Sequence, residues 1–176
     1  PKPIKKYAGV VAALLSSLAS TPAYFFMGFG EEFGWRAYLT PKLRKLMPNM
    51  FAIITTGLIW GLWHTPLIVR GYNFGKDYKG FPYLGVITMC LGCIALSFIF
   101  TYLTDKCNSV YPAAICHIVF DCMTNVIFTL TVSDAISISK HYFVSSLLIM
   151  LIAPTIIAVV GGLALLSLKK TRGNFS

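Results

Sequence analysis

Acidic residues are scarce in this sequence. Of its 176 residues only 6 are Asp or Glu, against 15 Lys and Arg, and charged residues make up 12% of the chain. A soluble domain is usually about one quarter charged. Half of that fraction, together with 56% hydrophobic residues, argues against a soluble domain and indicates a membrane protein.

The chain also lacks the features of a nucleic-acid-binding or a disulfide-stabilised protein. Its net charge of +9 comes from basic residues scattered over short polar segments, with no basic face interleaved with aromatics. Cations that flank apolar runs meet lipid headgroups, so we expect membrane lipids as partners and no nucleic acid. The five cysteines are odd in number, and Cys90 and Cys93 lie inside an apolar run, which favours small buried residues over a disulfide framework.

Long apolar runs dominate what is present. Five stretches approach the roughly 20 apolar residues that cross a bilayer. They cover about 8–30, 51–69, 82–103, 110–132 and 143–168. Pro22, Pro66 and Pro154 fall inside these stretches and are expected to kink their helices, which membrane helices tolerate. The predicted fold class is therefore all-α, a polytopic transmembrane helix bundle with about five spans.

Two connecting segments have recognisable patterns. In residues 36–49, "RAYLTPKLRKLMPN", apolar residues recur at helical spacing beside basic ones. This predicts a short interfacial amphipathic helix bounded by Pro41 and by Pro48 and Asn49. The loop 70–81 is polar and Gly-rich, and we expect it to be exposed. We treat residues 1–176 as a single transmembrane domain and, because the chain begins without Met, as a fragment of a longer protein.

The only two glutamates of the chain, Glu31 and Glu32, are adjacent at the end of the first apolar run. A charged group at the bilayer centre costs at least about 2.5–3.5 kcal/mol, so such residues usually mark function. On a helix, Glu32 and Arg36 are spaced i,i+4 with the acid first, the favoured order for an ion pair. Glu31 points about 100° away and is left free to act as a general base. The alternative is an ion-pair cluster at a helix end.

Ionisable residues occur in two further runs. His64 follows Trp60 by one helical turn, and we expect the indole to pack against the imidazole. His117 and Asp121 share a helix face, which Asn125 continues by one more turn. A pair at this spacing can hold one metal ion, or Asp121 can orient His117 through its ring N–H. Polar contacts between packed helices are the alternative for both clusters.

A bundle that brings the three clusters together makes a buried constellation of Glu31, His64, His117 and Asp121. In one use, His64, His117 and Asp121 bind a zinc ion whose water attacks a carbonyl group. In the other, without metal, Glu31 and His64 activate the water while His117 and Asp121 stabilise the oxyanion. Two other function classes stay open: a proton- or ion-coupled transporter that uses the buried Glu, His and Asp, and a haem protein with His64 and His117 as axial ligands.

These residues resemble the CPBP family of intramembrane proteases, the Abi or CAAX-protease and bacteriocin-processing group. The family motifs E-E-x-x-x-R, F-x-x-x-H and H-x-x-x-N are similar to "EEFGWR" (31–36), "WGLWH" (60–64) and "HIVFD" (117–121). The "HTP" at 64–66 and the Pro-Ala run before His117 also look like the family, and the resemblance covers roughly residues 20–130. Two positions depart from the pattern, with Trp60 in place of Phe and Asp121 in place of Asn.

The resemblance implies an intramembrane endopeptidase, with zinc or without metal. Glu31 would be the catalytic glutamate, His64 and His117 would complete the site, and Glu32 and Arg36 would support it. An ionised carboxylate cannot donate to an oxyanion as an amide can, so Asp121 fits better as a metal ligand, as an orienter of His117, or protonated.

The resemblance also implies substrates and a location. Family substrates include prenylated CAAX proteins, bacteriocin or pheromone precursors and membrane peptides, and some members confer bacteriocin self-immunity. We therefore expect a peptide or protein partner with a membrane-associated segment. We expect a multi-pass integral membrane protein, located in the plasma membrane of a prokaryote or in the endoplasmic reticulum of a eukaryote.

Overall fold

The computed structural model describes residues 3–133, and the regular structure in this range is helical throughout. In chain order the helices are α1 (Pro3–Glu32), the π-helix η1 (Phe33–Leu39), α2 (Thr40–Leu43), α3 (Asn49–Trp63), α4 (Thr65–Val69), α5 (Tyr83–Cys107) and α6 (Tyr111–Ser133). The predicted all-α class is thus confirmed for the described residues. The predicted stretch 143–168, with Pro154, lies outside them.

The first four predicted apolar runs are all helical. Two helical segments, Asn49–Val69 and Tyr83–Cys107, are long and apolar enough to cross a membrane, judged by length and composition alone. They correspond to the predicted runs 51–69 and 82–103. The runs 8–30 and 110–132 form α1 and α6, while their crossing of the membrane, and the total of five spans, stay predictions.

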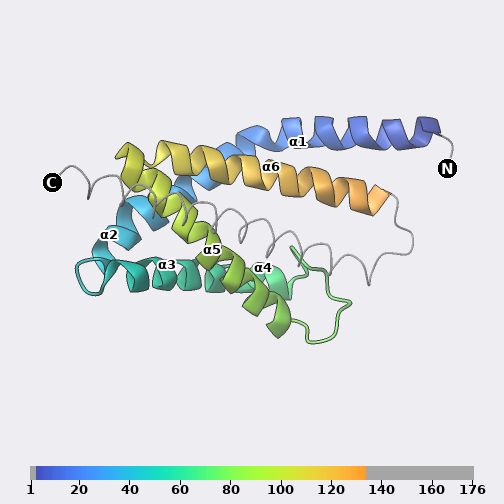
Figure 1. Ribbon diagram of the computed structural model, residues 1–176. Helices are drawn as coiled ribbons and strands as arrows, with labels where there is room; N and C mark the ends of the chain where they lie inside the picture. Colours follow the sequence, from blue (N-terminus) through green and yellow to red (C-terminus); the bar gives the residue numbers. More distant parts are fainter. Residues whose placement is uncertain (1–2, 134–176) are drawn as a thin grey trace, which may run out of the picture.

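The helices pack in two pairs that share a core (Figure 1). α1 lies along α6, α5 crosses α3 obliquely in contact with it, and α5 also contacts α6. Glycines let α3 and α5 approach closely, because a Cβ atom at Gly57 would come within 2.5 Å of the Ile94 Cα. Gly61 faces the backbone of Cys90 in the same way. Cys90 and Cys93 are buried free thiols in this contact, which confirms their interpretation as small packing residues.

The second predicted span is interrupted at His64. α3 ends at Trp63 and α4 begins at Thr65, with Pro66 in the first turn of α4. Proline has no N–H to donate and its ring clashes with the preceding turn, so it is accommodated most easily in the first turn of a helix. The predicted kink near Pro66 is therefore confirmed as a break between two helices, and it falls at a candidate catalytic residue.

Of the two predictions about the connecting segments, one is wrong and one holds in part. The segment 36–49 is not a separate helix beginning after Pro41, because α1 runs through η1 directly into α2 and Pro41 lies inside α2. Arg36 and Thr40 are buried, so this segment packs on the bundle instead of lying with all its polar groups outward. The loop 70–81 is exposed at several positions, including Lys76 and Lys79, as predicted, but Phe74 is 1% exposed and belongs to the hydrophobic core.

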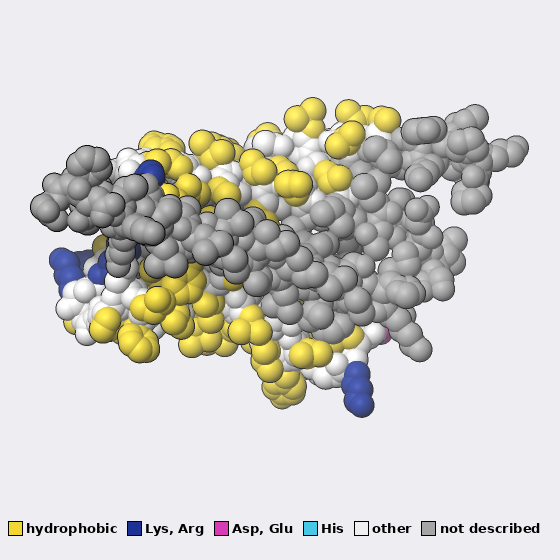
Figure 2. Space-filling model, viewed as in Figure 1, with side chains coloured by type: hydrophobic (Ala, Val, Ile, Leu, Met, Phe, Trp, Pro, Cys, Tyr) yellow, Lys and Arg dark blue, Asp and Glu magenta, His cyan; other side chains and the backbone are white. Residues whose placement is uncertain are grey.

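The described surface is strongly apolar. Figure 2 shows hydrophobic side chains over much of the visible described surface, with the few visible basic side chains toward its two ends. Large exposed apolar residues occur on every long helix, among them Leu18, Phe26, Leu62, Leu91 and Val119. Such a surface is too large to be a single docking patch and matches what a lipid environment requires.

Candidate active site

A buried ion-pair network lies where α1 meets α6. Glu32 is fully buried, and its Oε1 accepts hydrogen bonds from Arg36 Nη1 and from His117 Nδ1, both at 2.9 Å. The Glu32–Arg36 pair confirms the i,i+4 prediction. A carboxylate oxygen can only accept, so Nδ1 of His117 carries the proton in this bond. Glu32 thereby fixes the orientation of His117 from 85 positions away in the sequence.

Arg36 is held on all sides by the core. Its Nη2 donates to Ser97 Oγ at 3.0 Å, and its guanidinium carbon lies 4.5 Å from the Trp60 ring centroid and 5.0 Å from that of Phe100. These are cation–π distances. Within residues 3–133, Glu32 Oε2 and Arg36 Nε are buried without a hydrogen-bond partner. Both side chains are buried and paired with each other, so their role is to stabilise the fold and not to react with a substrate.

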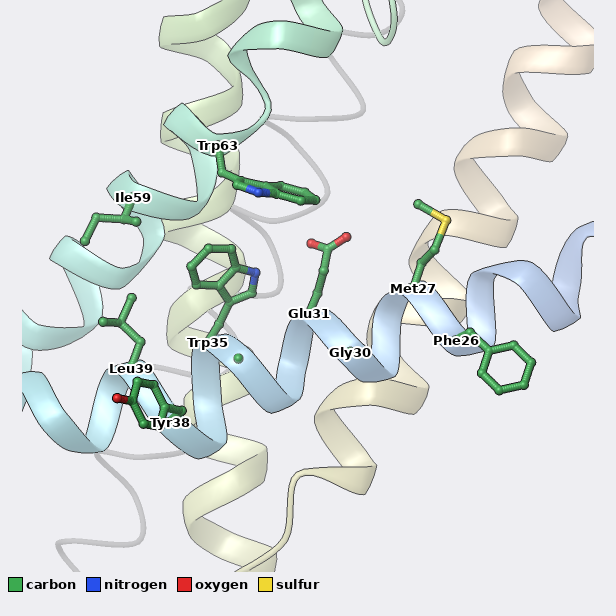
Figure 3. A pocket seen from close by; sticks show the side chains of 10 residues that line it. Phe26, Met27, Gly30, Glu31, Trp35, Tyr38, Leu39, Ile59 and Trp63 are labelled. Carbon is green, nitrogen blue, oxygen red and sulfur yellow. The ribbon is translucent and has the colours of Figure 1, made fainter.

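Glu31 has a different environment. Its Oε2 accepts a hydrogen bond from Trp60 Nε1 at 2.7 Å, and no ion pair of Glu31 is found among the described residues. The side chain lines an open cavity of about 650 Å³ whose other walls are mostly apolar or aromatic. Figure 3 shows the Glu31 carboxylate directed into this space, between Trp35 and Trp63 on one side and Met27 on the other. The predicted division between a paired Glu32 and an unpaired Glu31 is thus present.

His64 sits at the break between α3 and α4. Its Nδ1 lies 2.9 Å from the backbone oxygen of Trp60, and its ring lies 6.1 Å from the Trp60 ring and 5.1 Å from the Trp63 ring. The predicted packing against Trp60 is confirmed. A carbonyl oxygen can only accept, so Nδ1 is the donor and Nε2 of a neutral His64 keeps its lone pair. That nitrogen can then accept a proton or a hydrogen bond from water.

Asp121 and Asn125 continue the face of α6 beyond His117. Asp121 Oδ2 lies 3.6 Å from His117 Nε2, which is ion-pair distance but too long for a hydrogen bond. The His117 ring also packs against Trp60 at 5.2 Å and Phe100 at 5.4 Å. Asn125 is half-buried further along α6. The closer partner of His117 is therefore Glu32, whereas the sequence spacing pointed to Asp121.

The candidate zinc ligands are His64, His117 and Asp121. Within residues 3–133, no three His, Cys, Asp or Glu side chains come together as a set of metal ligands. His117 uses Nδ1 on Glu32 and His64 uses Nδ1 on a backbone carbonyl, which leaves Nε2 as the second ring nitrogen of each imidazole. A metal-ligating histidine commonly makes such a bond with its other nitrogen, so these bonds do not by themselves exclude a metal. Because no such set forms among the described residues, the structure does not bring His64, His117 and Asp121 together as a three-ligand zinc site.

Trp60 is the residue whose importance the sequence understated. It is 2% exposed and contacts Glu31, Arg36, His64 and His117. Only the contact to His64, one turn away, could be read from spacing. The presence of Trp at a position where the family pattern has Phe was the available signal, since an indole has an N–H donor that a phenyl ring lacks.

The π-helix explains how one short segment serves both core and cavity. η1 begins directly after Glu32, and the Thr40 backbone N–H donates to Trp35 O, five residues earlier. Thr40 Oγ1 also donates to Trp35 O at 2.8 Å. Such wide turns are rare and often occur at functional sites. Here the turn buries Arg36 in the core while Gly34 and Trp35 line the cavity beside Glu31.

Comparison with known families agrees with the motifs. The profile described as Type II CAAX prenyl endopeptidase Rce1-like matches residues 7–123, about two thirds of the chain. All three motif segments, 31–36, 60–64 and 117–121, fall inside the matched region. Comparisons with curated proteins and with solved structures found no significant match.

Proposed function

Since the chain belongs to the Type II CAAX prenyl endopeptidase Rce1-like family, we propose that it hydrolyses a peptide bond of a prenylated, membrane-associated substrate without a metal ion. Membership of this family indicates a protease and supports the CAAX type, and the family together with the apolar helices indicates an integral membrane protein. The same membership supports the hydrolase over the transporter and haem alternatives.

The single observation that carries the proposed mechanism is the contrast between the two glutamates. Glu32 is fully buried and held by Arg36 and His117, whereas Glu31 faces the cavity. A general base must reach the water that it activates. Glu31 meets this condition and Glu32 does not, so Glu31 takes the proton in the proposed reaction.

The proposed reaction begins with a water molecule between Glu31 and His64. Glu31 accepts one water proton as the water oxygen bonds to the substrate carbonyl carbon, and Nε2 of His64 accepts a hydrogen bond that orients the water. The carbonyl oxygen becomes an oxyanion. Protonated Glu31 then returns the proton to the amine nitrogen as the C–N bond breaks, which leaves a carboxyl and an amine product.

His117 is the proposed donor to the oxyanion. Its two ring nitrogens face carboxylates, Nδ1 toward Glu32 and Nε2 toward Asp121, so the ring can hold a second proton on Nε2. Donors already fixed in a site with little water stabilise a developing negative charge most effectively. Asp121 would support this proton, the orienting role considered from the sequence.

The cavity supports an apolar substrate. Apart from Glu31 its lining is aromatic, aliphatic or glycine, including Phe26, Trp35, Leu39 and Ile59. The Cys of a C-terminal C-a-a-X sequence carries the prenyl chain, which gives a substrate with the required apolar character. Bacteriocin or pheromone precursors are the other substrates considered, and a catalytically idle immunity protein is the remaining role.

The experiment is a cleavage assay with the purified chain in liposomes. The substrates are a farnesylated C-a-a-X peptide and the same peptide with a free Cys, and products are identified by mass spectrometry. We expect cleavage of the farnesylated peptide and no loss of activity after chelation with o-phenanthroline. If neither peptide is cleaved, the proposed endopeptidase activity is contradicted. Loss with chelator and recovery with zinc would contradict the metal-free mechanism, and solute flux without cleavage would favour the transporter.

A further inference from the structure

Trp60 makes directed contacts to two candidate catalytic side chains. Its indole Nε1–H donates to Glu31 Oε2 at 2.7 Å, and its backbone oxygen accepts from His64 Nδ1 at 2.9 Å. Both contacts have good hydrogen-bond distances. Trp60 is 2% exposed and packed in the core, so it cannot easily change its position. Glu31 and His64 are therefore both hydrogen-bonded to the same rigidly held residue.

The backbone contact exists because the helix ends at this place. The last four carbonyls of a helix have no intrahelical donor. α3 ends at Trp63, and the His64 backbone N–H donates to Gly61 and Leu62, so the Trp60 carbonyl remains available to the imidazole. The break before Pro66 thus turns an unused backbone acceptor into an orienting contact for His64.

The indole contact selects one oxygen of Glu31. Among the described residues, Trp60 is the hydrogen-bond donor found for this carboxylate, and it binds Oε2. The other oxygen, Oε1, is left for a ligand in the cavity that Glu31 lines. A phenyl ring at position 60 could pack in the same core but could not make this bond, since it has no donor.

We propose that Trp60 is a positioning residue that fixes Glu31 and His64 relative to each other, with its indole N–H holding Glu31 and its carbonyl holding His64. The proposal rests on the proposed peptidase function and assigns to this chain a role that its departure from the Phe of the family pattern makes possible. Because only the indole contact depends on the side chain, substitution of Trp60 separates the two contacts.

The kinetic test compares Trp60→Phe with the wild type in the liposome assay. Loss of a hydrogen bond to a charged group corresponds to about a 10- to 100-fold lower kcat, while KM stays within about twofold because the cavity walls are unchanged. β-(3-Benzothienyl)alanine at position 60 keeps the bicyclic shape and replaces N–H by sulfur, so it is expected to give the same loss. Full activity with this isostere would overturn the proposal.

The spectroscopic test does not depend on turnover. The chain contains three tryptophans, so ¹⁵N-indole labelling gives three N–H resonances, and Trp60→Phe identifies one of them. We expect the Trp60 resonance to move upfield in Glu31→Ala, which removes the acceptor. Met89→Leu, a volume-conserving change elsewhere in the same core, is the matched control and should leave it in place. A Trp60 resonance that ignores Glu31→Ala would overturn the contact.

The two failures are distinguishable. An active wild type with an equally active Trp60→Phe would overturn the role of Trp60 and leave the proposed function intact. A wild type without peptidase activity would overturn the proposed function and, with it, the catalytic meaning of the positioning, even if the indole resonance responds to Glu31→Ala.

Discussion

At the residue scale, adjacent glutamates have opposite environments because a helix places neighbours about 100° apart. Glu32 points into the core, where Arg36 and His117 neutralise it, and Glu31 points into the cavity. Burial makes the first costly to change, since removing one partner leaves the other charge uncompensated. Substitution of Glu32 should therefore lower mainly the stability of the fold, and substitution of Glu31 mainly the activity.

Glu32→Gln is expected to lower the free energy of unfolding by about 3–5 kcal/mol, because it leaves the buried Arg36 without its counter-charge. Glu31→Gln keeps the shape of a half-buried side chain that has no ion pair among the described residues, and should change it by less than about 1 kcal/mol. Thermal unfolding of both variants in the same detergent measures this. Equal destabilisation of the two would contradict the assignment of Glu32 to the structure and Glu31 to the site.

Part of the site could be predicted from the sequence. Glu32–Arg36 and Trp60–His64 are one turn apart on their helices, and both contacts are present. Glu31–Trp60 and Glu32–His117 join residues 29 and 85 positions apart, and no local pattern encodes such contacts. They depend on how α1, α3 and α6 pack, which the sequence period does not determine.

At the element scale, the α3–α5 contact depends on glycines. A Cβ atom at Gly61 would collide with the backbone of Cys90, whereas one at Gly30 on α1 would meet no described atom within 4 Å. Backbone atoms cannot move aside as a flexible side chain can. Substitution of each glycine by Ala therefore separates the effect of packing from that of helix propensity. Helix propensity alone favours Ala over Gly by about 1 kcal/mol in a helix interior.

Gly61→Ala is expected to destabilise the fold by about 1–3 kcal/mol, the usual cost of overpacking a core. Gly30→Ala, the matched control, should be neutral or slightly stabilising for the reason of propensity alone. Chemical denaturation followed by helical circular dichroism measures both. If Gly61→Ala were as stable as Gly30→Ala, the close approach of α3 and α5 would be refuted.

The helices themselves were largely predictable from apolar runs, since 51–69 and 82–103 lie close to Asn49–Val69 and Tyr83–Cys107. The π-helix was not, because its wide turn is stabilised by tertiary contacts of buried Arg36 and Thr40. The burial of Phe74 could not be predicted either. A polar, Gly-rich composition indicates a loop, but it does not show which side chains of the fold an aromatic residue in that loop will pack against.

At the scale of the whole molecule, the ends of the helices define two sides. Arg44 after α2 makes a bidentate bond to Asp105 near the end of α5, with distances of 2.8 and 2.6 Å. The hydrogen bonds that Arg44 donates to Asp105 raise the pKa of Arg44, so the guanidinium stays charged. α5 has 25 residues, or about 37 Å at 1.5 Å per residue, enough to cross a hydrocarbon core of about 30 Å.

Cys107, at the end of α5, and Lys76, in the loop before it, are therefore expected on opposite sides of the membrane. A membrane-impermeant maleimide applied to sealed vesicles should label the exposed Cys107 from one side only. Lys76→Cys in a Cys107→Ser chain should be labelled only from the other side, and Cys107→Ser alone gives the background. Labelling of both positions from the same side would rule out a crossing by α5.

Glu31 is the proposed general base that activates the water in a membrane-embedded endopeptidase. The most direct test of this role is the rate of farnesylated C-a-a-X peptide cleavage by wild type and by Glu31→Gln, each in liposomes and each verified as folded. We predict cleavage by the wild type and a loss of at least about 100-fold in kcat for Glu31→Gln, in the range that general acid–base groups contribute. Cleavage by Glu31→Gln at the wild-type rate would show that Glu31 is not the general base.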